Sequence, residues 1–184
     1  MVGNKKTTIK NVGNAGQAVV AFGDSLSYGY GAAKGQSYPD VLGQKISRPV
    51  VNMGRNGATA VSALPRLDEV LAENPYMVLI EYGGNDFMHA VPLNDTLTAI
   101  EKMVDGVQAA GAVAVIVDTG GYYGMNKYTK AYKKMAKEKG AVFVPGILNG
   151  IMGERGLMSD QIHPNAKGYA IVAEKVYKEI KGYL

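Results

Sequence analysis

Ser25, His163 and Asp160 have the side-chain types that covalent acyl transfer requires. Ser25 lies in VVAFGDSLSYGYGA, where an apolar run stops at a glycine and an acid. A serine hydroxyl is a weak nucleophile and needs a neighbouring base. His163 is the better of the two histidines for this, because it lies in SDQIHPNAKGY, between a loop and a helical pattern, shortly after Asp160. A short turn would let that carboxylate fix the imidazole tautomer and stabilise the imidazolium, so the spacing is compatible with a catalytic triad.

Acyl transfer also needs donors that meet the negative charge on the carbonyl oxygen. Two glycine-containing loops offer such groups: NMGRNGATA supplies the N–H of Gly57, and YGGNDF supplies the amide of Asn85. The N–H of Ser25, at the start of a helical turn, is a third donor. Asn-Gly and Gly-Asn pairs are also ordinary turn formers, so each loop taken alone is explained by turn chemistry.

Two other interpretations of the Ser25 segment compete with a nucleophile. A phosphate-binding P-loop requires Gly-Lys-Ser/Thr, which is missing from GDSLSYGYGAAKGQS, and GYGAAKG has one residue too many for a dinucleotide fingerprint. A plain serine-containing turn remains open from this segment alone. Asp24, beside the serine, is expected to bond the backbone of that turn rather than to take part in catalysis.

The order of apolar runs predicts an α/β fold that places all these loops at one sheet edge. Helical patterns separate the runs, which favours a three-layer α/β/α sandwich with a flavodoxin-like parallel sheet of order 2-1-3-4-5. In that order the segments of Ser25 and Asn85 follow adjacent strands and face each other. The predicted strands are Ala18–Phe22, Pro49–Met53, Met77–Tyr82, Ala112–Asp118 and Ala141–Val144, and the predicted helices are Pro39–Ser47, Thr59–Glu73, Leu93–Val107, Asn126–Lys139 and Tyr169–Ile180.

Bulk properties restrict the remaining classes of function. The 184 residues favour one domain at 18–184, preceded by a polar and possibly flexible lead at 1–17. A net charge of +4 is too small for a nucleic-acid footprint, and the absence of cysteine with only two histidines argues against a metal site. No apolar run is long enough for a membrane span, and the lead lacks the apolar core of an export signal. A cytosolic start and a trimmed export signal both fit this lead.

Four segments in order resemble the signature blocks of the SGNH hydrolases, the GDSL-type lipases and esterases. They read GDSLS, GRNG, GGND and DQIHP, and the resemblance covers residues 18 to 182. The surrounding sequence is especially similar to bacterial thioesterase/lysophospholipases and arylesterases. The resemblance implies Ser25 as nucleophile and oxyanion donor, Gly57 and Asn85 as the other donors, His163 as base and Asp160 as its partner.

The family implies an ester or thioester hydrolase that needs no cofactor and acts on aryl esters, short-to-medium acyl esters or lysophospholipids. A carbohydrate O-acetylesterase on the same scaffold is the alternative within enzymes. A flavodoxin-like module that binds small molecules or phosphate is the alternative outside them. Relatives are often periplasmic or lipid-anchored, which makes export an expectation, and a monomer is expected.

The acyl-binding surface is less well defined by the sequence. DFMHAVPL, after Asn85, is expected to form a mobile lip with Phe87 and Met88, and DTGGYYGM is expected to form the opposite wall with Tyr122 and Tyr123. Simple loop packing explains the lip equally well. The lysines of Asn126–Lys139 form a solvated face that could also attract anionic lipids. Glu81 interrupts an apolar strand, and we predict that it faces the rim of the sheet and binds loop N–H groups or Arg55.

Overall fold

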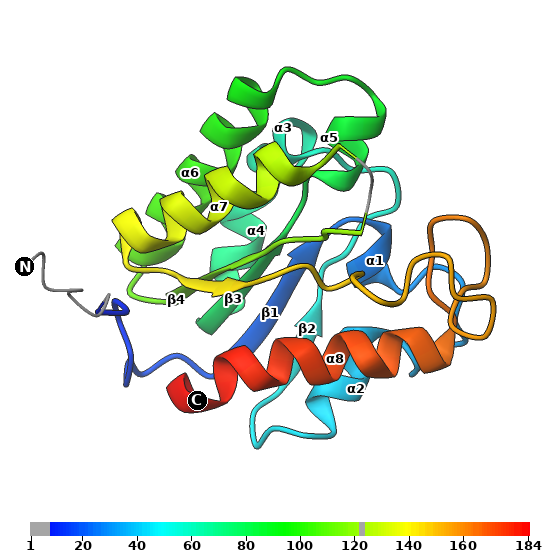
Figure 1. The fold of residues 1–184 in the computed structure, drawn as a ribbon. Helices are drawn as coiled ribbons and strands as arrows, with labels where there is room; N and C mark the ends of the chain where they lie inside the picture. The colour runs from blue at the N-terminus through cyan, green and yellow to red at the C-terminus, as the bar shows by residue number, and fades with distance from the viewer. Residues whose placement is uncertain (1–7, 122–123) are drawn as a thin grey trace, which may run out of the picture.

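The computed structural model describes residues 8–121 and 124–184. Its centre is one parallel sheet with the order β2-β1-β3-β4-β5, as the sequence predicts. The sheet lies between two layers of helices (Figure 1). The strands are β1 (Ala18–Gly23), β2 (Val50–Asn52), β3 (Pro75–Glu81), β4 (Val113–Val117) and β5 (Val142–Val144), each within two residues of its predicted range.

Eight α-helices and two short 3₁₀ helices join the strands within the described residues. They are α1 (Ser25–Tyr28), α2 (Tyr38–Gly43), α3 (Ala60–Ala63), η1 (Leu64–Arg66), α4 (Leu67–Ala72), α5 (Gly84–Met88), α6 (Leu93–Ala109), α7 (Asn126–Lys139), α8 (Ala166–Ile180) and η2 (Lys181–Tyr183).

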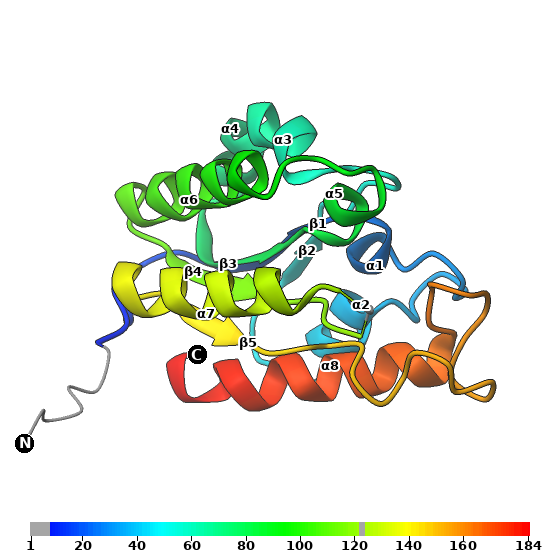
Figure 2. The same ribbon diagram turned by 45° about the horizontal axis from the view of Figure 1, so that its top comes forward.

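Alternation along the strands produces a core on each face of the sheet. Val20 and Phe22 of β1 face α3, α4, α6 and α7, whereas Val19 and Ala21 face α2 and α8. Figure 2 shows these helix layers on opposite sides of the sheet. Because the central strands β1, β3 and β4 are buried on both faces, their sequences are nearly continuous apolar runs rather than alternating ones.

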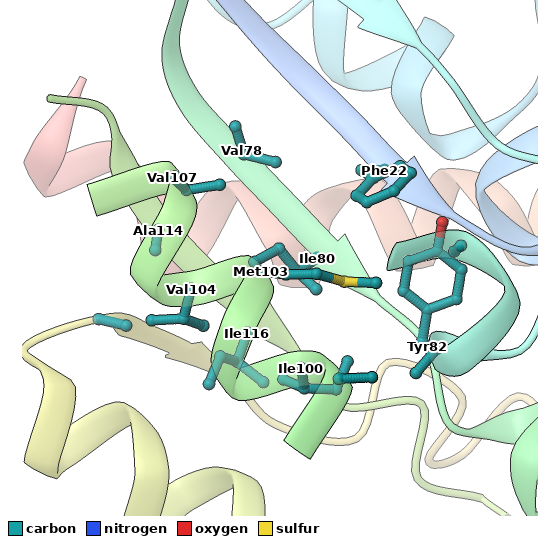
Figure 3. Packing of buried hydrophobic residues seen from close by; sticks show 14 of the residues in the cluster. Phe22, Val78, Ile80, Tyr82, Ile100, Met103, Val104, Val107, Ala114 and Ile116 are labelled. Atoms are coloured by element: carbon teal, nitrogen blue, oxygen red, sulfur yellow. The ribbon is translucent and has the colours of Figure 1, made fainter. Parts of the chain in front are cut away.

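Helix α6 illustrates how a periodic pattern becomes a packed face. Its buried side chains recur at spacings of three and four and cover β1, β3 and β4. Met103 and Val107 of α6 lie on the side of Ile80 and Val78 of β3, in the cluster that also contains Phe22 (Figure 3). Met103 is fully buried, which makes this face a sensitive point for stability.

The predicted helices differ from the structure in two places. The expected helix over Thr59–Glu73 is divided into α3, η1 and α4, because Pro65 lies in its middle and lacks the N–H that a continuous helix needs. Helix α5 lies in the segment that was expected to be a mobile lip, so Phe87 and Met88 belong to a helix rather than to a loop.

The described part of the N-terminal lead is hydrogen-bonded to the rest of the chain. The Asn11 amide donates to the carbonyls of Gln108 and Ala112, and the Asn14 amide donates to that of Tyr76. We infer that residues 18–184 form one domain, because a single continuous sheet carries both cores. Within residues 8–121 and 124–184, every helix is too short or too polar to cross a bilayer.

Candidate active site

The structure brings Ser25, His163 and Asp160 together at the carboxyl end of the sheet. Ser25 is the first residue of α1, directly after β1, and the other two lie in the loop before α8, at the same end of the molecule (Figure 1). His163 Nε2 lies 3.0 Å from Ser25 Oγ, and His163 Nδ1 lies 2.8 Å from Asp160 Oδ2. These distances make a continuous chain from hydroxyl through imidazole to carboxylate.

A tight turn holds Asp160 and His163 in this arrangement. Asp160 Oδ1 accepts the N–H groups of Ile162 and His163, so the carboxylate bonds both the backbone and the ring of its partner. The carbonyl of His163 in turn accepts the N–H and the hydroxyl of Ser159. The turn is therefore fixed by its own polar groups, and only the ring nitrogen Nε2 is directed to Ser25.

Pro164 lies two residues before α8. It pairs with Met158 in an isolated antiparallel bridge, and α8 begins at Ala166. Asn165 caps the helix by accepting the N–H groups of Lys167 and Gly168. The bridge closes the base of the loop that carries His163.

The contact with Asp160 directs Nδ1 of the His163 ring toward the carboxylate and Nε2 toward Ser25. Burial alone would raise the pKa of Asp160, but the bonds from the His163 ring and from two backbone N–H groups lower it below its usual value. An ionised Asp160 accepts a hydrogen bond from Nδ1–H, and the lone pair on Nε2 then faces the serine hydroxyl. The ring of Tyr30, whose centroid is 4.5 Å from that of His163, packs against the imidazole.

Asp24 caps the short helix that begins at Ser25. Its Oδ1 accepts the N–H of Leu26 at 2.9 Å, which is the turn role expected from the sequence. The N–H of Ser25 itself is at the first helical position and has no intrahelical acceptor. This N–H is therefore available to a substrate oxygen.

Asn85 is more constrained than the sequence indicates. Its Nδ2 donates to Asp24 Oδ2 and to the carbonyl of Ala58, both at 3.0 Å, so both amide hydrogens have protein partners. The bond to Ala58 brings the loop of Gly57 beside Asn85, and Gly57 is exposed there with a φ of +73°. The three predicted oxyanion donors therefore lie on α1, on the Gly57 loop and on α5, and Asn85 connects these segments by its bonds to Asp24 and Ala58.

Asp86 is a functional-site residue that the sequence reasoning missed. It is fully buried, and its carboxylate accepts the N–H of Ala60 and the hydroxyl of Thr96. Burial raises the pKa of Asp86. These bonds tie α5 to the end of the Gly57 loop and to α6, and the only signal for them in the sequence is an acid that directly follows Asn85.

Glu81 binds a loop N–H, as predicted, but Arg55 is not its partner. Its Oε2 accepts the hydroxyl of Ser27 at 3.0 Å and the N–H of Asp24 at 3.4 Å. The side chain is fully buried at the end of β3, beside Gly23 in the β1–β3 register. Glu81 is thus under the candidate nucleophile rather than on the rim.

The predicted acyl-binding residues lie at the edge of the site or outside the described residues. Phe87 and Met88 are exposed on α5, and Phe87 contacts Tyr128 of α7 edge-on with ring centroids 6.1 Å apart. His89 ends this helix and is exposed. Tyr122 and Tyr123 are outside the described residues. Among the described residues, no cluster of three or more histidines and acids could hold a metal ion.

Comparisons with known proteins agree with this geometry. The model of the GDSL-like lipase/acylhydrolase family matches residues 21–171. The chain is 28% identical over 182 residues to a protein named esterase TesA from Pseudomonas aeruginosa, covering 92% of this chain and 90% of that one. It is also 28% identical over 177 residues to thioesterase 1/protease 1/lysophospholipase L1 of Escherichia coli, covering 91% and 85%. A crystal structure of TesA superposes with a TM-score of 0.83 at 27% identity, covering 91% of this chain and all of that one.

Proposed function

Since the chain belongs to the GDSL-like lipase/acylhydrolase family and is an ester hydrolase, we propose that Ser25 is its nucleophile and that it cleaves carboxylic esters or thioesters through an acyl-enzyme. His163 acts as the general base and acid, and Asp160 orients and stabilises it. The observation that carries this proposal is the 3.0 Å contact between His163 Nε2 and Ser25 Oγ, combined with the 2.8 Å contact between His163 Nδ1 and Asp160.

The proposed reaction has two halves. The Oγ of Ser25 attacks the carbonyl carbon while His163 Nε2 takes the hydroxyl proton, and the resulting oxyanion is met by the N–H groups of Ser25 and Gly57 and by the amide of Asn85. The protonated His163 then gives its proton to the leaving alkoxide or thiolate, which leaves an acyl ester on Ser25. Water attacks that ester with His163 again as base, and the acid is released.

The assignment is tested by ester hydrolysis with matched serine variants. Ser25→Ala and His163→Ala are each expected to lower kcat on a p-nitrophenyl ester by about 10⁴-fold or more, with the fold intact by circular dichroism. Ser47→Ala, at an exposed position before β2, is the control and keeps wild-type turnover. Retained activity in the Ser25 variant would refute the nucleophile.

The substrate class is proposed from the family and the site edge together. Two relatives are named an esterase and a thioesterase/lysophospholipase, and the exposed Phe87 and Met88 offer apolar surface beside Asn85. We therefore expect activity on aryl esters and on acyl chains of short to medium length. A panel of p-nitrophenyl esters and acyl-CoA thioesters of rising length tests this, and activity limited to acetylated sugars would support a carbohydrate O-acetylesterase instead.

We also propose that α7 brings the site to anionic lipid surfaces. The helix carries six lysines against one glutamate, and Phe87 packs against its first turns, so a basic face adjoins exposed apolar residues. Such a face attracts anionic headgroups while apolar side chains enter the interface. The exposed lysines are Lys127, Lys130, Lys133, Lys134 and Lys137.

Vesicle sedimentation tests the lipid contact. Binding to vesicles of phosphatidylcholine with phosphatidylglycerol is expected to exceed binding to phosphatidylcholine alone and to fall with salt. Replacing Lys130, Lys133 and Lys137 by Gln should remove that excess, whereas Lys167→Gln and Lys178→Gln on α8 should preserve it. Equal binding to both vesicle types would contradict the proposal.

A further inference from the structure

A pair of buried carboxyl groups lies beneath Ser25 and has no part in the proposed triad. Asp24 is 2% exposed and Glu81 is fully buried. The two groups lie together, because the N–H of Asp24 donates to Glu81 Oε2 at 3.4 Å. Burial is the main cause that raises the pKa of each carboxyl group, and the charge of Asp24 raises that of Glu81 further. Two buried carboxylates in contact cannot both be ionised without a large cost, so the pair holds a proton.

The hydrogen bonds around the pair indicate which group carries the proton. Both oxygens of Asp24 accept from fixed donors, Oδ1 from Leu26 N–H and Oδ2 from the Asn85 amide. Such a pattern suits an ionised carboxylate, which only accepts. A hydrogen on either oxygen of Asp24, directed along its existing bond, would displace the donor that bonds that oxygen.

Glu81 has the opposite pattern. Its Oε2 accepts from Ser27 and from the N–H of Asp24, whereas Oε1 is buried with no partner among the described residues. The hydroxyl of Ser27 has one hydrogen, which it donates to Glu81. The hydroxyl of Tyr38, 3.0 Å from Ser27 Oγ, therefore donates to Ser27. A hydrogen on Oε1 would turn this orphaned acceptor into a donor, and a hydrogen bond with the Asp24 side chain is among the causes that raise the pKa of Glu81.

We propose that Glu81 carries the proton of the pair and donates it in a hydrogen bond to the ionised Asp24. Asp24 is then a positioning residue that orients the Asn85 amide for the oxyanion. The bond to Asp24 fixes one amide hydrogen of Asn85. The second amide hydrogen, which now bonds Ala58, is the one shared with the developing oxyanion. This inference rests on the proposed function, because it assigns a partner to one of that site's oxyanion donors.

The packing around the pair supports a fixed role rather than an incidental one. Gly23 leaves room for it, since a Cβ there would lie 2.6 Å from Glu81 Oε2. Burial is the main cause that raises the pKa of Glu81 well above its usual value, and it raises that of Asp24 to about 6. Other titratable groups act on the pair or are affected by its charge, and they come from several neighbouring elements. They are Tyr38 of α2, Tyr82 after β3, Asp86 of α5, Tyr132 of α7, His163 before α8 and Tyr169 of α8.

Isosteric variants separate the two carboxyl groups. Asp24→Asn keeps one oxygen to cap Leu26 but replaces the acceptor of Asn85 by an NH₂ group, so kcat should fall at least about ten-fold with KM little changed. Glu81→Gln keeps an acceptor for Ser27 and a donor for Asp24, so it should retain kcat within about three-fold. Glu81→Leu removes both the acceptor and the donor, so its kcat should fall. The retained kcat of Glu81→Gln would then show that the hydrogen bonds of this side chain matter.

A double-mutant cycle tests whether Asp24 acts through Asn85. Asn85→Ala should lower kcat by about 10²- to 10³-fold, and Asp24→Asn combined with it should lower kcat no further. The infrared spectrum of the wild type at neutral pH, after subtraction of that of Glu81→Gln, should contain the carbonyl band of a protonated carboxylic acid. Additive losses, a carboxylate band in its place, or a Glu81→Gln loss as large as that of Asp24→Asn would each overturn the proposal.

Labelling with a fluorophosphonate distinguishes this inference from the proposed function. Wild type that is folded and unlabelled at Ser25 would overturn the proposed function itself. Wild type that is labelled at Ser25, with additive effects of Asp24 and Asn85, would overturn only the positioning role of Asp24.

Discussion

Replacing Glu81 by Gln should make the protein more stable than wild type as pH rises. Glu81 is fully buried, and burial raises its pKa well above the usual value of 4.5. The folded wild type therefore retains a proton that the unfolded chain releases above that value. A raised folded pKa gives stability that is present below the unfolded pKa and is lost as pH rises, so the wild type loses stability relative to the neutral Gln variant.

The magnitude follows from one proton taken up on folding. Each pH unit in this range changes the difference in unfolding free energy by about 1.4 kcal/mol. Because the unfolded carboxyl is already mostly ionised at pH 5, the difference between variant and wild type should grow between roughly pH 5 and pH 7, by up to about 2.5 kcal/mol when folded Glu81 keeps its proton throughout that range.

Urea unfolding at several pH values measures this difference directly. Unfolding free energies of wild type and Glu81→Gln are compared at each pH, with equal m-values as the check on two-state behaviour. Glu138→Gln, at an exposed position of α7, is the matched control and should differ from wild type by an amount nearly independent of pH. A pH-independent difference for Glu81→Gln would show that Glu81 is ionised when folded and would refute the argument.

Three further substitutions test other parts of the structure. Asp160→Asn should lower kcat by about 10²- to 10⁴-fold with little change in KM, because the imidazole loses the acceptor that fixes its tautomer; steady-state kinetics would contradict this if turnover stayed within a few-fold of wild type. Gly23→Ala should destabilise the protein by about 1–3 kcal/mol in urea unfolding, since its methyl group meets Glu81 Oε2, and an unchanged midpoint would argue against that close packing. Met103→Ala, at a fully buried position of α6, should cost about 2–5 kcal/mol by the same assay, and a loss below 1 kcal/mol would mean that the core closes around the gap.

The strand order and the positions of Ser25, Asp160 and His163 could be predicted from patterns in the sequence. The apolar runs became strands in the expected order because βαβ connections leave few arrangements for such a pattern. Ser25 and His163 could be anticipated because each lies at the boundary of a recognisable element. The short separation of Asp160 from His163 made their contact a local matter as well.

The parts that depend on register between distant segments could not be predicted. Gly23 pairs with Glu81 across β1 and β3, and this register places Asp24, Glu81 and Asn85 together. In the sequence, Asp24 and Asn85 are both common turn residues, and nothing in either segment indicates that their side chains form a hydrogen bond. Helix α5 was missed for a similar reason, since Asp86 stabilises it through Thr96 and Ala60 from other elements.

The most direct test of the whole account is to identify the residue that reacts covalently. Folded wild type is treated with a fluorophosphonate and its peptides are analysed by mass spectrometry. The account predicts a single adduct on Ser25 that forms slowly in His163→Ala and is lost in Ser25→Ala. An adduct on another serine, or none on folded wild type, would contradict it.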